Sequence, residues 1–199
     1  MNRYVKMLVF AFVMGVFTSA LLVSVDLLTA ERIEANQQAN LYMAILDNND
    51  IEYTQADLAD IFEQEIEVIE EDGLTFYIHP ESGSVSYRIE GGGVWGPIIG
   101  IVTLESDFET IKAIAILEQE ETPGLGGVIE NPEYLAKFVG KSMVPELIIS
   151  RDADMDDPNE VDAIVGGTRT SNNFQEIMNN EYQRHREVFD TLDLDEVIS

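Results

Sequence analysis

The segment from Met7 to Val25 contains no charged residue, and this constrains the chain more than any other feature. Its 19 residues approach the roughly 20 apolar residues with which a helix crosses a bilayer. Arg3 and Lys6 precede the segment, and a basic flank of this kind stays in the cytoplasm. We therefore expect residues 1–30 to form a single-pass anchor in the inner membrane, with the rest of the chain on the periplasmic side.

A cleaved signal peptide is the alternative explanation of this segment. The apolar part of a signal peptide runs only about 7–15 residues, which is shorter than the stretch found here. Leu28 also stands where a cleavage site before Glu31 would need a small residue. Both observations favour an anchor.

Acidic residues dominate the composition outside this segment. The chain has 38 Asp and Glu residues against 11 Lys and Arg, for a net charge of −27. The first thirty residues hold Arg3, Lys6 and Asp26, a net +1, so the other 169 carry −28. Because nucleic-acid binding requires clustered cations, we expect no nucleic-acid partner. The absence of cysteine from the sequence excludes disulfides, thiolate metal sites and iron–sulfur clusters.

The pattern of apolar residues predicts helices first, then strands, then a last helix. Residues 31–70 are predicted to be helical, with a break at Asn48–Asp50, where turn-forming residues cluster. The other expected elements are strands at 74–79, 84–90, 98–104, 112–117 and 144–149, a short helix at 132–138 capped by Asn131, and a helix at 171–189. This order predicts an α+β fold, a twisted and mainly antiparallel sheet flanked by helices.

No standard catalytic motif occurs in the sequence, so we expect no catalytic residue in this chain. His79 and His185 lie among polar neighbours and are predicted to be surface residues. The acidic runs 118–121 and 152–157 lack the EF-hand pattern. We interpret the second run as a solvated face and expect no metal site.

Two glycine-containing segments could hold a ligand. Glu118–Gly127 combines one proline with three glycines, whose bare backbone permits close approach of a flat ligand, although an ordinary turn would have the same composition. In Asp162–Ser171, Gly166 and Gly167 precede the last predicted helix, whose positive N-terminus favours an anion. The alternative is that Thr170 or Ser171 merely caps that helix.

Three motifs in a fixed order resemble a known family. Gly93–Gly100, Glu118–Gly127 and Asp162–Thr168 are similar to the FMN-binding domain shared by two membrane complexes. In the sodium-translocating NADH:quinone reductase this domain belongs to the NqrC subunit, and in the Rnf-type ferredoxin:NAD oxidoreductase to the RnfG subunit. The resemblance covers roughly residues 85–180 and the N-terminal helix. We accordingly expect a helical lead-in at 31–72 and an FMN-binding domain at 73–199.

The resemblance also implies a site for covalently bound FMN. In the family, the flavin phosphate is esterified to the last threonine of D-x-x-(S/T)-G-A-T, which corresponds here to Thr168; Val165 and Gly167 depart from that pattern. The phosphate end of the site would include Gly166, Gly167 and Thr170. The residues implied near the flavin ring are Glu121, Thr122, Gly124, Leu125, Gly126 and, as a nearby aromatic, Trp95.

The function implied by the resemblance is electron transfer within an ion-pumping complex. The second motif is more similar to the quinone reductase than to the Rnf complex, so we expect a subunit that relays electrons through FMN inside the sodium-translocating enzyme. The expected partners are the other membrane subunits and the flavin transferase that attaches FMN. Two alternatives remain: an Rnf-type subunit, and an anchored assembly or binding module without flavin.

Overall fold

The computed structural model describes residues 2–191, which belong to two units, Met1–Asn40 and Leu41–Ser199. The first unit consists of most of helix α1 (Arg3–Asn48), whose side chains are almost all exposed, including the large apolar ones between Tyr4 and Leu28. By length and composition α1 can cross a membrane. Exposed apolar side chains over such a length indicate a membrane anchor, in agreement with the sequence prediction.

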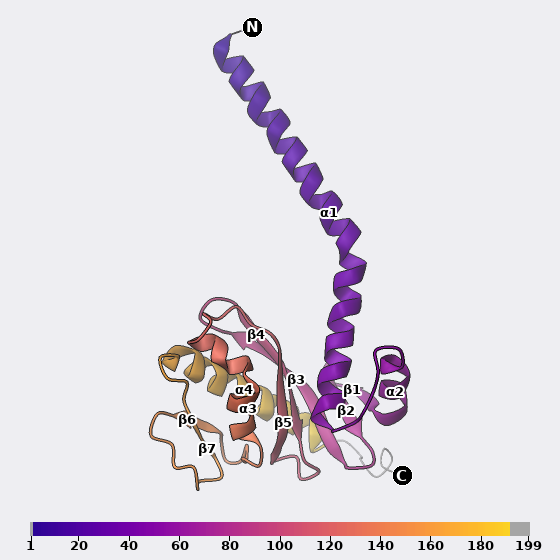
Figure 1. Ribbon diagram of the computed structural model, residues 1–199, viewed down its shortest axis with the longest axis vertical. Helices are drawn as coiled ribbons and strands as arrows, with labels where there is room; N and C mark the ends of the chain where they lie inside the picture. Colours follow the sequence, from indigo (N-terminus) through magenta and orange to yellow (C-terminus); the bar gives the residue numbers. More distant parts are fainter. Residues whose placement is uncertain (1, 192–199) are drawn as a thin grey trace. The chain divides into compact units, whose positions relative to one another are not determined.

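The second unit is built on an antiparallel five-stranded sheet whose strands follow one another in chain order (Figure 1). The strands are β1 (Glu67–Glu71), β2 (Leu74–His79), β3 (Ser84–Gly92), β4 (Pro97–Leu104) and β5 (Ile111–Glu118). A separate parallel pair is formed by β6 (Ile148–Ser150) and β7 (Glu160–Asp162). The helical elements are α2 (Leu58–Glu65), α3 (Pro132–Leu135), α4 (Thr168–Phe189) and the 3₁₀ turns η1 (Gly126–Glu130) and η2 (Ala136–Phe138).

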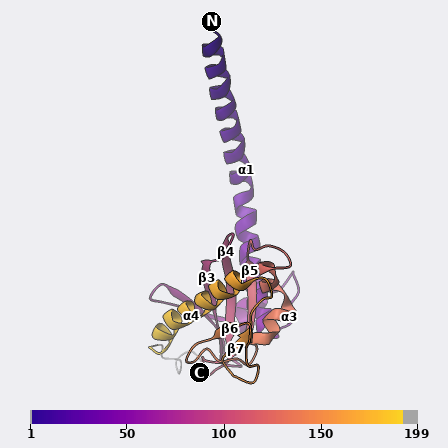
Figure 2. The same cartoon turned by 90° about the vertical axis from the view of Figure 1, so that its left-hand side faces the viewer.

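Each face of the large sheet packs against its own set of helices. Helix α4 runs across one face (Figure 2), where Phe174 and Met178 are fully buried with the α3 and η1 side chains. The other face packs against the end of α1 and against α2, through a cluster that includes Ile45 and Phe62. Alternate residues of β4 serve the two cores, with Val102 on the α4 side and Ile101 on the other, as the period of two in a strand requires. The predicted α+β architecture is therefore confirmed.

Several local predictions need correction. Helix was predicted through residue 70, but Glu67–Glu71 form strand β1, because pairing with β2 places Ile69 opposite Phe76. The strand expected at 144–149 is confirmed only at its end, in β6, and the parallel partner β7 was not predicted. The last helix begins at Thr168, three residues before the predicted start, whereas the cap of α3 by Asn131 is confirmed.

Both histidines were predicted to be surface residues, and both are buried. His185 of α4 is 3% exposed and stacks on Tyr87, with ring centroids 4.4 Å apart. His79 is 7% exposed, and its Nδ1 lies 2.8 Å from Ser82 Oγ. Polar neighbours in the sequence did not indicate burial here because it arises from tertiary contacts. The rings of Phe76 and Tyr87 pack against His185, and Glu65 and Ser82 lie beside His79.

Candidate functional site

A cavity of about 260 Å³ lies in the second unit, between several loops and the start of helix α4. Its walls come from the turn before β4, the loop after β5, the residue following β6, and the start of α4. The lining residues are Val94, Trp95, Glu121, Thr122, Leu125, Gly126, Arg151, Gly166, Gly167, Thr168, Arg169 and Thr170. All the residues predicted for a flavin site therefore line one cavity except Gly124, which is exposed on the loop after β5.

The buried carboxylate of Glu121 connects segments that line the cavity. Glu121 is 5% exposed, and its Oε1 accepts hydrogen bonds from the backbone N–H of Val94 at 2.5 Å and of Trp95 at 3.4 Å. Its Oε2 accepts from the Thr170 hydroxyl at 2.8 Å. Buried charges are stable only when such partners are supplied. Glu121 thus joins the turn before β4 to the first turn of α4, and Thr170 serves this contact instead of capping the helix.

Glycine is required at the point where these segments touch. A Cβ atom built on Gly126 would meet Thr170 Oγ1 and Glu121 Oε2. No side chain could enter there without separating the loop after β5 from α4. The glycines of this loop therefore have a packing reason in addition to the predicted approach of a flat ligand.

The first turn of α4 contributes Thr168, Arg169 and Thr170 to the wall of the cavity. Gly167 occupies the N-cap position without a side-chain cap, and Thr168 is the first residue of the 22-residue helix. Ser171 does not cap the helix either, because its Oγ accepts from the Ile164 N–H at 3.0 Å. The first N–H groups of a helix lack partners within it and carry a partial positive charge. The arrangement can therefore hold an anion beside the Thr168 hydroxyl.

Two arginines add positive charge at this end of the cavity. Arg151 Nη2 donates a hydrogen bond of 2.6 Å to Thr168 Oγ1, and Arg169 also lines the cavity. Arg151 was not predicted, since in the sequence it only begins a polar connector. Pairing of β6 with β7 sets Ser150 opposite Asp162, and this pairing carries Arg151 to the loop that leads into α4.

The two departures from the family motif have different surroundings. Val165 is 93% exposed and does not line the cavity, so its side chain does not support the fold at this point. Gly167 is buried at the N-cap, and a Cβ there would meet Ile164 Cγ2 at 2.8 Å. The position of Gly167 is thus closely packed, whereas that of Val165 is open to solvent or to another protein.

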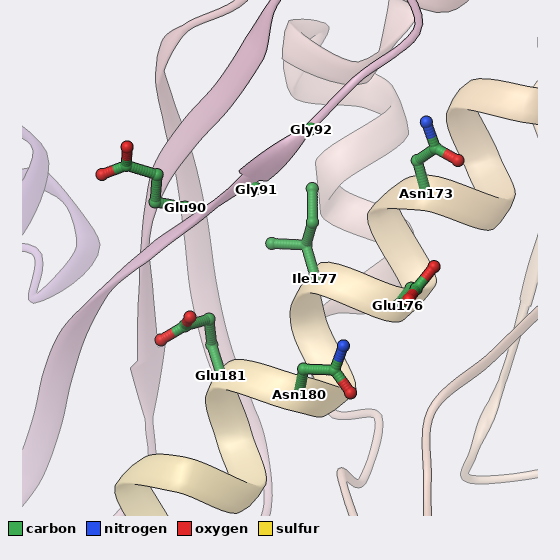
Figure 3. Close-up of a pocket in the computed structure, with 8 residues that line it drawn as sticks. All are labelled: Glu90, Gly91, Gly92, Asn173, Glu176, Ile177, Asn180 and Glu181. Atoms are coloured by element: carbon green, nitrogen blue, oxygen red, sulfur yellow. The ribbon is translucent and has the colours of Figure 1, made fainter.

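The described residues also form another hollow and a group of possible metal ligands, whose chemistry differs from that of the cavity beside Thr168. The hollow between β3 and α4 has three carboxylates on its walls, from Glu90, Glu176 and Glu181 (Figure 3), and this charge disfavours a phosphate. Glu65, His79 and Glu81 have potential ligand atoms within 4.8 Å of one another. The predicted solvated run at 152–157 forms no such three-ligand group within residues 2–191.

Comparison with known proteins gives a match for the segment that contains the cavity residues. Residues 93–183 match the family model of the FMN-binding domain. The NqrC subunit of the Na⁺-translocating NADH-quinone reductase from Vibrio vulnificus is 38% identical over 93 residues, 44% of this chain and 36% of the relative. The corresponding subunit from Neisseria meningitidis serogroup A is 38% identical over 98 residues, 47% of this chain and 38% of the relative. The matches thus span little more than a third of these relatives' own length.

Solved structures show the same fold. The crystal structure of NqrC from Shewanella oneidensis has a TM-score of 0.64 and 20% identity, covering 74% of this chain and 93% of that one. The corresponding subunit from Parabacteroides distasonis has a TM-score of 0.62 and 22% identity, covering 74% and 90%. The resemblance predicted from the three motifs is therefore confirmed: residues 93–183 match the model of the FMN-binding domain, and the chain is similar to the NqrC subunit of the Na⁺-translocating NADH-quinone reductase.

Proposed function

We propose that this chain carries FMN as a phosphoester on Thr168 and relays electrons as a membrane-anchored subunit of a Na⁺-translocating NADH-quinone reductase. The observation that supports this most strongly is the position of Thr168. Its hydroxyl lies in the first turn of α4, in contact with Arg151, beside the cavity lined by the other predicted site residues except Gly124. An anionic phosphodiester is favoured at such a helix start.

Attachment would use only one atom of the chain. The Thr168 Oγ–phosphorus bond forms while one P–O bond of a phosphoanhydride of FMN breaks, and the hydroxyl proton ends on the released phosphate. No electron is transferred in this step. We propose that a flavin transferase supplies the donor and recognises the exposed segment around Val165.

The ring end of the cavity would orient the flavin and leave part of it accessible. At about 260 Å³ the cavity is smaller than most ligand pockets, which hold roughly 300–1,000 Å³. Trp95 and Leu125 at the rim are 69% and 45% exposed. The bound cofactor supplies the redox chemistry, so the chain has only to place it within reach of neighbouring subunits.

Co-expression with an active flavin transferase tests the proposal. A denaturing gel should show a fluorescent band for the full chain and no such band for Thr168→Ala. Thr54→Ala is the control, because this exposed threonine lies outside the cavity; its band should persist. A wild-type band without fluorescence, beside a second substrate that the same transferase labels, would favour the alternative of a module without flavin.

A further inference from the structure

Arg151 stands out among the arginines of the acidic second unit. Arg88, Arg184 and Arg186 each have a nitrogen within 3.8 Å of a carboxylate oxygen. Among residues 41–191, neither Arg151 nor Arg169 has such a partner, and both line the same cavity. In a chain with 38 carboxylates, cations without carboxylate partners are available for an external anion.

We infer that Arg151 is a positioning residue for the flavin phosphate: it holds the Thr168 oxygen in place and binds the phosphate that becomes attached to it. This inference rests on the proposed function. Its basis is the 2.6 Å hydrogen bond from Arg151 Nη2 to Thr168 Oγ1. Because arginine can only donate, the hydroxyl must accept this bond, which leaves its own proton directed elsewhere.

The guanidinium group suits both the hydroxyl and the later phosphodiester. It presents several N–H donors in one plane, so one can stay on Oγ1 while another reaches a phosphate oxygen. The positive charge also favours negative charge on the attacking oxygen and on the phosphate. Arg169 follows Thr168 directly and lines the cavity, but it has no hydrogen bond to the hydroxyl among residues 2–191. The positioning role is therefore assigned to Arg151.

Two measurements on the full chain, purified in detergent, test this role. The first is the initial rate of flavinylation by an active transferase, read from intact mass. Arg151→Gln should slow it at least tenfold, while Arg88→Gln, which removes another exposed charge that lies outside the cavity, should leave it unchanged. Arg151 is exposed, so Arg151→Gln should melt at the wild-type temperature.

The second measurement needs no covalent attachment. In the Thr168→Ala chain, FMN should bind more tightly than riboflavin, which lacks the phosphate. Adding Arg151→Gln should weaken FMN binding about tenfold and leave riboflavin binding unchanged. Arg151→Lys should restore part of the FMN preference, because it keeps the charge without the planar donor geometry.

The outcomes separate the two proposals. If the wild-type chain acquires no FMN from a transferase that labels another substrate, the proposed function is wrong. If the wild type is labelled and Arg151→Gln is labelled equally fast, with the preference for FMN over riboflavin intact, the role of Arg151 is wrong while the proposed function stands.

Discussion

At the scale of single residues, Glu121 is the polar centre of the site. Three donors converge on its buried carboxylate. Replacement of Glu121 by alanine leaves those donors without their acceptor, so we expect the free energy of unfolding to fall by about 2–3 kcal/mol. Urea denaturation measures this loss. The control is Glu146→Ala, an exposed carboxylate, for which the change should stay within about 0.5 kcal/mol; equal effects of both variants would contradict the role of Glu121.

His185 makes stability depend on pH. Burial lowers its pKa, the nearby Arg184 charge acts in the same direction, and the hydrogen bond to the Glu181 carbonyl opposes them. Between the lowered folded pKa and the ordinary value of about 6.5, the unfolded chain binds more protons. The stability supplied by neutral His185 is therefore present above pH 6.5 and lost as pH falls through the folded pKa.

Urea denaturation at pH 7.5 and pH 5.5 measures that dependence. The His185→Gln variant should lose less stability than the wild type over this interval. Burial raises the pKa of the neighbouring Glu181, so protonation of this carboxyl group stabilises the folded chain as pH falls. Wild type and variant both retain Glu181, so the difference between them reports on His185. A pH dependence that is unchanged in the variant would contradict the assignment.

At the scale of elements, the packing of α4 on β3 depends on a missing side chain. A Cβ atom on Gly91 would meet Cγ1 and Cδ1 of Ile177, which faces it from α4 (Figure 3). Gly91→Ala should therefore destabilise the domain by about 1–3 kcal/mol. Gly92→Ala is the matched control, since a Cβ there has nothing within 4 Å. Thermal unfolding of both variants tests this, and equal melting temperatures would show that the contact is not tight.

The sequence predicted most of the sheet because period-two alternation is a local property. Strands β2 and β3 follow it closely, whereas β4 is a continuous apolar run that is buried on both faces of the sheet. Strand β1 was missed although Asp72 and Gly73 both have positive φ in the turn to β2, a sequence pair that is typical of a tight hairpin. Polar and apolar residues do not alternate in β1, because this strand lies at the edge of the sheet and is mostly exposed.

The site was only partly accessible to sequence reasoning. Glycine motifs and hydroxyls stand out in a sequence, so the loop after β5 and the start of α4 were identified. Arg151 was not, because its approach to Thr168 depends on the parallel pairing of β6 with β7. The use of Thr170 by Glu121 likewise joins residues that are 49 positions apart.

At the scale of the whole molecule, charge repulsion opposes folding. The 169 residues after the first thirty carry −28, and salt screens repulsion between exposed charges. We expect the melting temperature of the chain in detergent to rise as NaCl increases from about 0.05 M toward 1 M, where the screening length falls to roughly 3 Å. A melting temperature that stays constant or falls over this range would contradict strong self-repulsion.

The orientation in the membrane is a further whole-molecule prediction. Arg3 and Lys6 precede the apolar segment of α1, so the domain that follows this segment should face the periplasm. Protease added to spheroplasts should remove the domain and leave a short anchored fragment. A cytoplasmic marker protein must stay intact in the same sample. Protection of the domain until detergent is added would reverse the proposed topology.

The mass of the intact chain, extracted from membranes of cells that contain an active transferase, shows whether FMN is attached to Thr168. We expect one added FMN, less one water, located on the peptide that contains Thr168, and no addition in Thr168→Ala. An unmodified wild-type chain, or a flavin on any other residue, would contradict it.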